Sequence, residues 1–365
     1  MRYFDHNATT PVAPEVLETL ARVHAEVFGN PSSIHTPGQQ ARREVESARA
    51  AVARWLGCQA REIVFTSGGT ESDNLAILGA PPGHVVTTAI EHPAVLEAAR
   101  LRDATFVPPD GQGRVDPDGI RRALRPDTVL VSVMHANNET GVLQPVGEIA
   151  AIAREAGVLF HSDGVQAAGR IGVDVQALGV DLYSVSGHKL NAPKGVGALY
   201  VREGVKLAPR QVGGRHERDL RAGTENVAGV AALGAAARLP LPGTAPLRDR
   251  LEALVRERIP NVLIHGERAP RLPNTSSIAF PGIEAEALVI ALDLAGFAVS
   301  TGAACSSGAT RPSHVLEAMG VPPAISKASI RISIGRGNTM ADIEALAAAL
   351  ESAVARLRRL SPAYA

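Results

Sequence analysis

The residue types that could do chemistry gather at the ends of strand-like runs. Lys189 follows the apolar run Asp181-Leu-Tyr-Ser-Val185, with His188 directly before it. An ammonium group is strongly hydrated, so a lysine at the end of a buried strand needs a partner or a chemical task. One such task is to lose its proton and form a Schiff base with an aldehyde. The alternative is an exposed loop lysine, the commoner place for this residue type.

Other polar residues stand at the ends of neighbouring strand-like runs. They are His92, Asn138, Asp163 and Gln166. In an α/β protein with a mostly parallel sheet, ligands bind beyond the carboxyl ends of the strands. The sequence therefore predicts that these side chains line one site together with Lys189.

A possible anion site follows the short strand-like run Glu62-Ile-Val-Phe-Thr66. The next residues, Ser67-Gly-Gly-Thr-Glu-Ser-Asp-Asn74, open a helix. Two glycines let the backbone approach a ligand, and the free N–H groups of a helix start attract an anion. Neither a P-loop nor a dinucleotide fingerprint is present, because Gly-Lys-Ser/Thr and G-x-G-x-x-G are both missing. The alternative is an ordinary helix cap with glycine in the turn.

A lysine, an aspartate on the next strand end and an anion site suit pyridoxal phosphate. Lys189 would hold the aldehyde as a Schiff base. Asp163 would pair with the pyridinium nitrogen and keep it protonated, so that the ring can accept electrons. The groups expected to hold the phosphate lie at the helix start and at the lysine's strand end: Gly69, Thr70, Ser186 and His188.

Three further side chains would contact the ring or the substrate. Gln166 could donate to the phenolic oxygen, and His92 could stack on the ring or shuttle a proton, with a structural histidine as the alternative. Arg331 lies in Ser329-Ile-Arg-Ile-Ser-Ile334, whose period of two places it with two serines opposite three isoleucines. On a half-buried strand it could clamp the carboxylate of an amino-acid substrate. A solvated face or a structural ion pair is the alternative for this arginine.

The chain has two cysteines, Cys58 and Cys305. This number rules out a disulfide framework, and a C-x-x-C metal site is absent. Cys305 lies in Ser300-Thr-Gly-Ala-Ala-Cys-Ser-Ser-Gly308, where the small neighbours can bury a thiol only poorly, so we expect a nucleophile or sulfur carrier. Cys58 follows Trp55-Leu-Gly at a helix end and is expected to be structural.

Composition narrows the partners and the location. Of 365 residues 45% are hydrophobic, and 37 basic residues balance 37 acidic ones, so direct nucleic-acid binding is not expected. The longest apolar stretch, 285–299, contains two acidic residues and is too short to cross a bilayer. No secretory h-region follows the first residues, and the cysteines are few, so we predict a cytoplasmic protein without a membrane partner.

The alternation of strand-like and helical segments predicts an α/β fold, with a large, mostly parallel sheet and a smaller α/β C-terminal domain. The predicted large cofactor-binding domain is 15–245, and the predicted small domain comprises 1–14 and 246–365, including Cys305. Strands are expected at 62–66, 84–88, 128–134, 157–162, 181–186, 197–201, 276–280 and 329–334. Helices are expected at 14–28, 39–56 and 285–294, and a last one near the end of the chain.

Together these motifs resemble the cysteine desulfurases of the NifS/IscS family, within the class V aminotransferase group. The resemblance covers nearly the whole chain. The motifs that carry it are Asp5-His-Asn-Ala-Thr-Thr-Pro11, Gly29-Asn-Pro-Ser-Ser33, Thr66-Ser-Gly-Gly-Thr-Glu-Ser-Asp-Asn74, Glu91-His92, Asn137-Asn-Glu139, Asp163-Gly-Val-Gln166, Ser186-Gly-His-Lys189, Ala222-Gly-Thr-Glu-Asn226, Thr301-Gly-Ala-Ala-Cys-Ser-Ser307 and Arg331-Ile-Ser333. Their common order and spacing make the match specific.

The resemblance implies a fold-type-I, pyridoxal-phosphate-dependent transferase that acts as a homodimer. Such an enzyme converts L-cysteine to L-alanine and leaves a persulfide, here on Cys305. Sulfur would then pass to an iron–sulfur scaffold or another sulfur-acceptor protein, for iron–sulfur cluster assembly or tRNA thiolation. The chain stops soon after Arg359-Leu-Ser-Pro, without the longer tail that some members use to dock a scaffold, which leaves the acceptor open.

The resemblance also implies residue roles. Lys189 would carry the cofactor and abstract the substrate's Cα proton, while His92 would stack on the ring and act as acid–base. Thr224 would reach the phosphate bound by the other subunit. The substrate carboxylate would be held by Asn30 and Arg331. Two amides would bind the cofactor, Asn138 and Gln166, the former also near the substrate.

Several rival functions stay open at this point. A selenocysteine lyase or an aminotransferase of the same fold would keep Lys189 and Asp163 without needing Cys305. A non-catalytic binding protein of this fold would be expected to lose one of the first two residues, and neither is lost. A metal protein is disfavoured, because His161 and Asp163 lack convincing further ligands.

Overall fold

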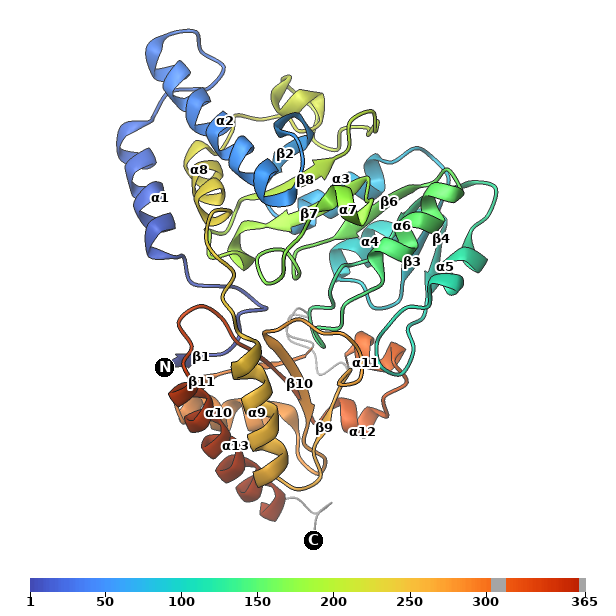
Figure 1. Ribbon diagram of the computed structural model, residues 1–365, viewed down its shortest axis with the longest axis vertical. Coiled ribbons are helices and arrows are strands. Elements are labelled where there is room, and N and C mark those ends of the chain that lie inside the picture. Colours follow the sequence, from blue (N-terminus) through green and yellow to red (C-terminus); the bar gives the residue numbers. More distant parts are fainter. Residues whose placement is uncertain (303–312, 361–365) are drawn as a thin grey trace.

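A seven-stranded sheet carries the strand ends at which the sequence places its functional side chains (Figure 1). The structure is a computed structural model that describes residues 1–302 and 313–360. In the order β2-β8-β7-β6-β5-β3-β4, strand β8 is antiparallel to both neighbours and the remaining pairs are parallel. The strands are β2 (Ile63–Thr66), β3 (His84–Thr88), β4 (Ala104–Val107), β5 (Thr128–Ser132), β6 (Leu159–Asp163), β7 (Leu182–Ser186) and β8 (Gly197–Val201). The predicted, mostly parallel α/β sheet is confirmed.

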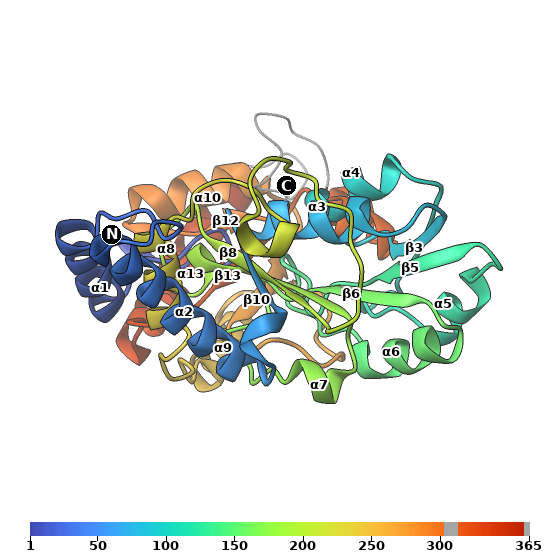
Figure 2. The ribbon, with the colours of Figure 1, turned by 90° about the horizontal axis from the view of Figure 1, so that it is seen from above.

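Helices cover both faces of this sheet because both faces are apolar. Successive strand residues point to opposite sides, so Val64 packs with α3 and α4, whereas Ile63 and Phe65 pack with α2, α6 and α8. Figure 2 shows α3 and α4 on one side of the sheet and α6 and α7 on the other. The helices are α1 (Pro14–Glu26), α2 (Thr36–Leu56), α3 (Gly69–Gly79), α4 (Pro93–Arg100), α5 (Pro117–Ala123), α6 (Val146–Glu155), α7 (Val175–Leu178) and α8 (Val227–Ala236). We refer to this layered unit as the large domain.

A second hydrophobic core lies below the first in Figure 1. Its antiparallel sheet has the order β12-β13-β10-β9, and the first strand of the chain, β1, pairs with β11 beside it. The strands are β1 (Arg2–Tyr3), β9 (Leu263–Ile264), β10 (Thr275–Ala279), β11 (Phe297–Ala298), β12 (Ser300–Thr301) and β13 (Ser329–Ser333). The helices packed on this core are α9 (Ala245–Arg258), α10 (Ala285–Leu294) and α13 (Met340–Leu360). We refer to this unit as the small domain.

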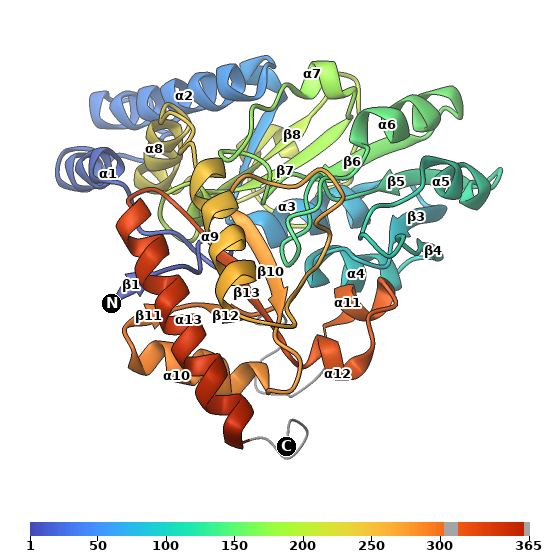
Figure 3. The same cartoon turned by 60° about the horizontal axis from the view of Figure 1, so that its bottom comes forward.

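One short helix from the C-terminal part of the chain packs on the large domain. Helix α11 (His314–Ala318) places Val315 and Leu316 in the core of the large sheet, and Met319 follows them there. Figure 3 shows α11 and α12 (Pro323–Ser326) apart from α9, α10 and α13. The chain therefore returns to the large domain after β12 and then re-enters the small domain in β13.

Strand β13 differs from its prediction in one respect. The sequence indicates a half-buried strand with a polar face, but all five residues from Ser329 to Ser333 are buried. The isoleucines lie in the small-domain core as expected, while Arg331 and Ser333 face polar groups from other segments. The polar face is thus covered by the junction between the two domains and not by solvent.

No helix in the described ranges is long and apolar enough to cross a membrane.

Candidate active site

Residues from three strand ends converge on Asn7. The carbonyl oxygen of Asn7 accepts hydrogen bonds from Lys189 Nζ and from Gln166 Nε2, the latter at 3.0 Å. The amide of Asn7 donates to the carbonyl of Asn138 at 3.2 Å. Lys189 Nζ also donates to the Ala8 carbonyl at 2.8 Å. The structure thus brings together the lysine and both amides that the sequence predicts to bind cofactor.

Asn7 itself has no predicted role, and yet it is the centre of this group. Its side chain is buried, donates to Thr275 Oγ1 at 2.9 Å and accepts from Asn274 Nδ2 at 3.0 Å. Its backbone N–H donates to Ser333 Oγ at 2.9 Å. The motif Asp5-His-Asn-Ala-Thr-Thr-Pro11 was the available signal, but a polar loop without periodicity does not reveal which side chain turns inward.

Asp163 ends β6 in a fully buried position beside Lys189. Burial raises the pKa of Asp163 to about 6, while the Val165 N–H, 2.9 Å from Oδ1, and the charge of Lys189 lower it. The backbone carbonyl of Asp163 accepts from His135 N–H at 2.9 Å, which fixes the strand end. A buried carboxyl with a raised pKa is stabilised as an anion by a cation placed against it, as a protonated ring nitrogen would be.

His92 begins α4, and its protonation state follows from its contacts. Its Nδ1 accepts a hydrogen bond from the Ala94 N–H at 3.1 Å, so the proton of the neutral ring resides on Nε2. Burial, then the charges of Lys189 and His314, lower the pKa of His92 to about 4. The ring is therefore neutral near pH 7, which suits stacking on an aromatic cofactor.

The start of α3 forms an anion cradle next to the end of β7. The helix cap is Gly68, which supplies no side-chain hydrogen bond, so the first N–H groups of this 11-residue helix have no capping side chain. Ser186 lies against it: a Cβ added to Gly68 would be 3.6 Å from Ser186 Oγ, and one added to Gly69 would be 3.7 Å from Ser186 Cβ. Thr70 is exposed in the first turn. Three of the predicted phosphate-binding groups thus lie together.

Three other predicted residues lie apart from this cradle or make other contacts. His188 is half-buried, and its Nδ1 lies 3.1 Å from Thr9 Oγ1. Thr224 is exposed in the loop before α8. Asn30 is exposed between α1 and α2, where its Oδ1 accepts from the Ser32 N–H at 2.9 Å. The predicted roles of these three residues stay predictions.

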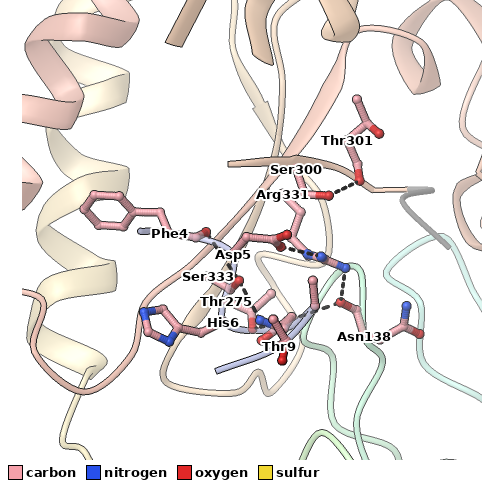
Figure 4. Close-up of polar contacts among 12 residues, drawn as sticks. Phe4, Asp5, His6, Thr9, Asn138, Thr275, Ser300, Thr301, Arg331 and Ser333 are labelled. Atoms are coloured by element: carbon pink, nitrogen blue, oxygen red, sulfur yellow. Dashed lines mark hydrogen bonds and ion pairs between the residues drawn. The ribbon is translucent and has the colours of Figure 1, made fainter. Parts of the chain in front are cut away.

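Arg331 reaches the site from β13, as Figure 4 shows. Its side chain is 2% exposed and forms an ion pair with Asp5 at 2.7 Å. A second hydrogen bond runs to the Asn138 carbonyl at 3.1 Å. The Nε–H of this guanidinium is buried and has no partner within the described residues. The arginine is thus held in place by two contacts and keeps one donor for a ligand.

Three unpaired polar atoms at this site test whether a cofactor and an amino acid would fit. Besides Arg331 Nε, they are Asn138 Oδ1 and Gln166 Oε1, both buried without a partner among the described residues. An amide oxygen does not take up a proton near neutral pH, and a guanidinium does not lose one, so neither kind of atom can be satisfied by titration. Such atoms are expensive to bury unless something bonds them. The residues present therefore fit a polar ligand at this place.

Two unpaired carboxyl oxygens nearby have a different explanation. Glu91 Oε2 and Asp73 Oδ1 are also buried without a hydrogen-bond partner in the described ranges, although Asp73 Oδ1 lies 3.6 Å from His161 Nε2. Burial raises the pKa of Glu91 to about 8 and that of Asp73 above its usual range. Each can therefore be satisfied by a proton and does not require a ligand.

The two cysteines have contrasting positions. Cys58 is half-buried against the large-domain core, and burial raises the pKa of its thiol to about 12, which agrees with a structural residue. Cys305 lies outside the described residues, so its predicted role stays a prediction. Within the described ranges, no group of three or more His, Cys, Asp or Glu side chains could hold a metal ion.

Comparisons with known proteins agree with this geometry. Residues 2–346 match the family model described as aminotransferase class-V. The chain is 44% identical to the cysteine desulfurase IscS of Dictyoglomus turgidum, over 99% of this chain and 96% of that protein. A solved structure of a NifS-like protein matches with a TM-score of 0.90 and 36% identity, covering 98% of this chain and all of that one. SspA, solved in complex with cysteine, matches with a TM-score of 0.84 and 33% identity over 92% of this chain and 99% of that one.

Proposed function

Because this chain belongs to the class-V aminotransferase family and is a pyridoxal-phosphate-dependent cysteine desulfurase, we propose how its own residues divide the reaction. When bound, pyridoxal phosphate supplies an aldehyde for an amine and a ring that accepts electrons. Lys189 would hold the aldehyde, and Asp163 would face the ring nitrogen. The phosphate would lie on the N–H groups at the start of α3, with Ser186 beside them.

Proton movement falls to Lys189 and His92. Lys189 Nζ would be the base for the Cα proton of the substrate, and its hydrogen bonds to the Asn7 and Ala8 carbonyls support this role by holding it at the strand ends. With the cofactor bound, Asp163 would favour a protonated ring nitrogen, and the pairing would stabilise the buried charge of Asp163. His92, neutral with its proton on Nε2, would cover the ring and could donate or receive a proton there.

Substrate orientation falls to Arg331 and Asn138. The free Nε–H of Arg331 donates to the substrate carboxylate, and Asn138 Oδ1 accepts from a donor of the substrate or cofactor. The ion pair with Asp5 prevents the guanidinium from rotating away. Asn30 would add a further contact to the carboxylate, as the resemblance implies.

Sulfur transfer falls to Cys305. Its thiolate attacks the substrate sulfur, a sulfur–sulfur bond forms, and the electron pair of the broken sulfur–carbon bond goes to the substrate's Cβ, which takes up a proton. The balance is one protein thiol plus L-cysteine giving one protein persulfide plus L-alanine. Both sulfur atoms are oxidised by one step, and carbon is reduced by two, so no outside oxidant is needed.

We further propose a homodimer in the cytoplasm that passes the persulfide sulfur to an iron–sulfur scaffold or another acceptor protein. The large apolar side chains that the large domain exposes in a single chain include Phe28, Ile34 and Val212, at 85%, 94% and 81%. Thr224 is exposed as well, as expected of a residue that serves the phosphate of a second copy. The name IscS of the relative suggests iron–sulfur assembly.

The observation that carries the proposal is the set of unpaired amide and guanidinium atoms around Lys189. The test compares alanine and sulfide released from L-cysteine with a reductant for wild type, Cys305→Ala and the control Cys58→Ala. We expect equimolar products from wild type and from Cys58→Ala, and almost none from Cys305→Ala, which should still bind pyridoxal phosphate. Full activity of Cys305→Ala would remove this cysteine from the mechanism.

A further inference from the structure

The stretch of chain that carries Cys305 begins and ends on different hydrophobic cores. It leaves the small domain after β12, whose Ser300 pairs with Arg331 of β13. It resumes at Ser313 and α11, whose Val315 lies in the core of the large domain. Two ends on two cores have a fixed separation only if some contact ties them together.

Glu139 makes such a contact with both ends. Its Oε2 accepts a hydrogen bond from Ser313 Oγ. The same oxygen lies against Gly302, because a Cβ added there would be only 2.8 Å from it. Glu139 is 3% exposed, and its own N–H donates to Asn137 Oδ1 at 2.9 Å. One buried carboxylate, on a turn of the large domain, thus meets the last described residue before the stretch and the first one after it.

The contact at Ser313 also fixes the start of α11. Ser313 Oγ accepts from the Leu316 N–H at 3.1 Å and so caps the helix while it donates to Glu139. The next residue, His314, lies with Nε2 2.9 Å from the Glu91 carbonyl, directly before His92. The beginning of α11 is therefore bound at two points to turns that also carry Asn138 and His92.

These contacts have no part in the roles given above. Burial raises the pKa of Glu139, whereas the Ser313 hydrogen bond and the charges of His314 and Arg331 lower it, so these neighbours stabilise the buried carboxylate. A buried carboxylate that contacts two chain ends is suited to set their separation. The site next to it, at Asn138 and Arg331, is where the substrate carboxylate is expected.

We propose that Glu139 is a positioning residue for sulfur transfer, which sets where the Cys305-bearing stretch begins and ends relative to the substrate. The proposal rests on the proposed function, because it assumes attack by Cys305 on the substrate sulfur. Releasing one end leaves the groups that bind the cofactor and the substrate in place but lowers the fraction of time in which the thiol can meet the sulfur. Misplacement by about 1 Å can slow a reaction by about 100-fold.

The test separates substrate binding from thiol attack in single turnovers of the cofactor-loaded enzyme. Binding is followed by the change in cofactor absorbance on adding L-cysteine, and attack by the rate at which Cys305 becomes persulfidated, measured by alkylation and mass spectrometry. For Glu139→Ala we expect unchanged binding and persulfidation slowed about 10- to 100-fold. Glu139→Gln keeps an acceptor for Ser313 and should recover most of the rate.

A second variant and a surface control make the result decisive. Gly302→Ala should slow persulfidation as Glu139→Ala does, since its Cβ would displace the carboxylate. Glu148→Ala removes a carboxylate that is 66% exposed and should change nothing. Wild-type persulfidation rates in Glu139→Ala and Gly302→Ala would overturn the proposal, as would parallel losses of binding and rate. If Glu139→Ala fails to fold, Gly302→Ala decides. No persulfide on wild-type Cys305 would instead refute the proposed function.

Discussion

Two arginines of this protein, Arg49 and Arg331, are both buried, but they differ in whether all of their guanidinium nitrogens have hydrogen-bond partners. Arg49, on α2, has a partner for each of its three guanidinium nitrogens: two bonds of 2.8 Å to Glu217, one of 2.8 Å to the Ile63 carbonyl and one of 3.3 Å to Glu46. Arg331 has an ion pair with Asp5 and a bond to Asn138, and its Nε–H has no partner in the described chain. A complete set of partners marks a brace, and an incomplete one marks a place for a ligand.

The residues around the Arg49–Glu217 ion pair support this distinction. Glu217 and the two residues after it, Arg218 and Asp219, have φ angles of 44°, 60° and 63°, in the left-handed region that non-glycine residues avoid. The bonds to Arg49 hold this loop in a strained conformation. A cavity of about 390 Å³ borders the same pair, yet none of its lining residues belongs to the strand-end site. The cavity and the charged groups beside it therefore belong to a structural contact and not to the candidate active site.

The largest effect is expected from removing the reacting amine. Lys189→Ala should lose the absorption band of the lysine-bound cofactor and slow alanine formation by on the order of 1000-fold or more. The exposed Lys194, five positions later, provides the matched control Lys194→Ala. An unchanged absorption band in Lys189→Ala would contradict the assignment of this lysine.

Breaking the Arg49–Glu217 ion pair should lower the free energy of unfolding without affecting catalysis. Arg49→Ala leaves the Glu217 carboxylate buried without its partner, which should lower the free energy of unfolding by about 3–5 kcal/mol. Urea unfolding measures this change. The KM for cysteine of the folded fraction should stay as in wild type. A raised KM with unchanged unfolding would reverse the comparison.

Weakening the Arg331–Asp5 ion pair should instead impair substrate binding and change the stability far less. Arg331→Lys keeps a charge for Asp5 but cannot offer the Nε–H in the same geometry. The KM for cysteine should rise about 10- to 100-fold, the loss of one or two hydrogen bonds to a charged group. The free energy of unfolding should change far less than in Arg49→Ala. An unaltered KM would show that Arg331 has a structural role like that of Arg49.

The smallest effect is expected at Glu91, whose buried Oε2 has no hydrogen-bond partner in the described residues and can carry a proton. Burial raises the pKa of Glu91 from 4.5 to about 8 in the folded protein. The folded state therefore keeps a proton on Glu91 at pH values where the unfolded state has lost it. As a result, the contribution of Glu91 to the free energy of unfolding falls as the pH rises from 4.5 to about 8. Glu91→Gln should remove the dependence. Between about pH 6 and 7 the unfolding free energy of wild type should fall relative to the variant by about 1 kcal/mol. An equal pH dependence in both proteins would show that Glu91 is ionised.

The strand ends were predictable from sequence because apolar runs reveal parallel strands. Strands β3 and β8 have the predicted bounds, and Asp163 ends β6. Once a parallel sheet is inferred, its carboxyl edge gathers His92, Asn138, Asp163 and Lys189 without further information. In the structure Lys189, Gln166 and Asn138 come together through hydrogen bonds that each of them makes with Asn7.

The contacts that cross between domains were not predictable in the same way. Asn7 and Asp5 lie in a turn-rich segment, and their partners Thr275 and Arg331 are more than 260 residues away. Nothing periodic links such positions, so no pattern shows which polar residue turns inward. The same applies to Glu139, whose contact with Ser313 depends on α11 returning to the large domain.

The pairing of β1 with β11 has a consequence for synthesis. Residues 2 and 3 leave the ribosome well before residues 297 and 298, with which they pair, and Asp5 must wait for Arg331. At ~5–20 residues per second, the interval is roughly 15–60 s. During it the large-domain sheet can form while Asn7 still lacks its small-domain partners Asn274, Thr275 and Ser333. The catalytic centre of a nascent chain is therefore completed late, when its oldest residues meet strands made near the end of synthesis.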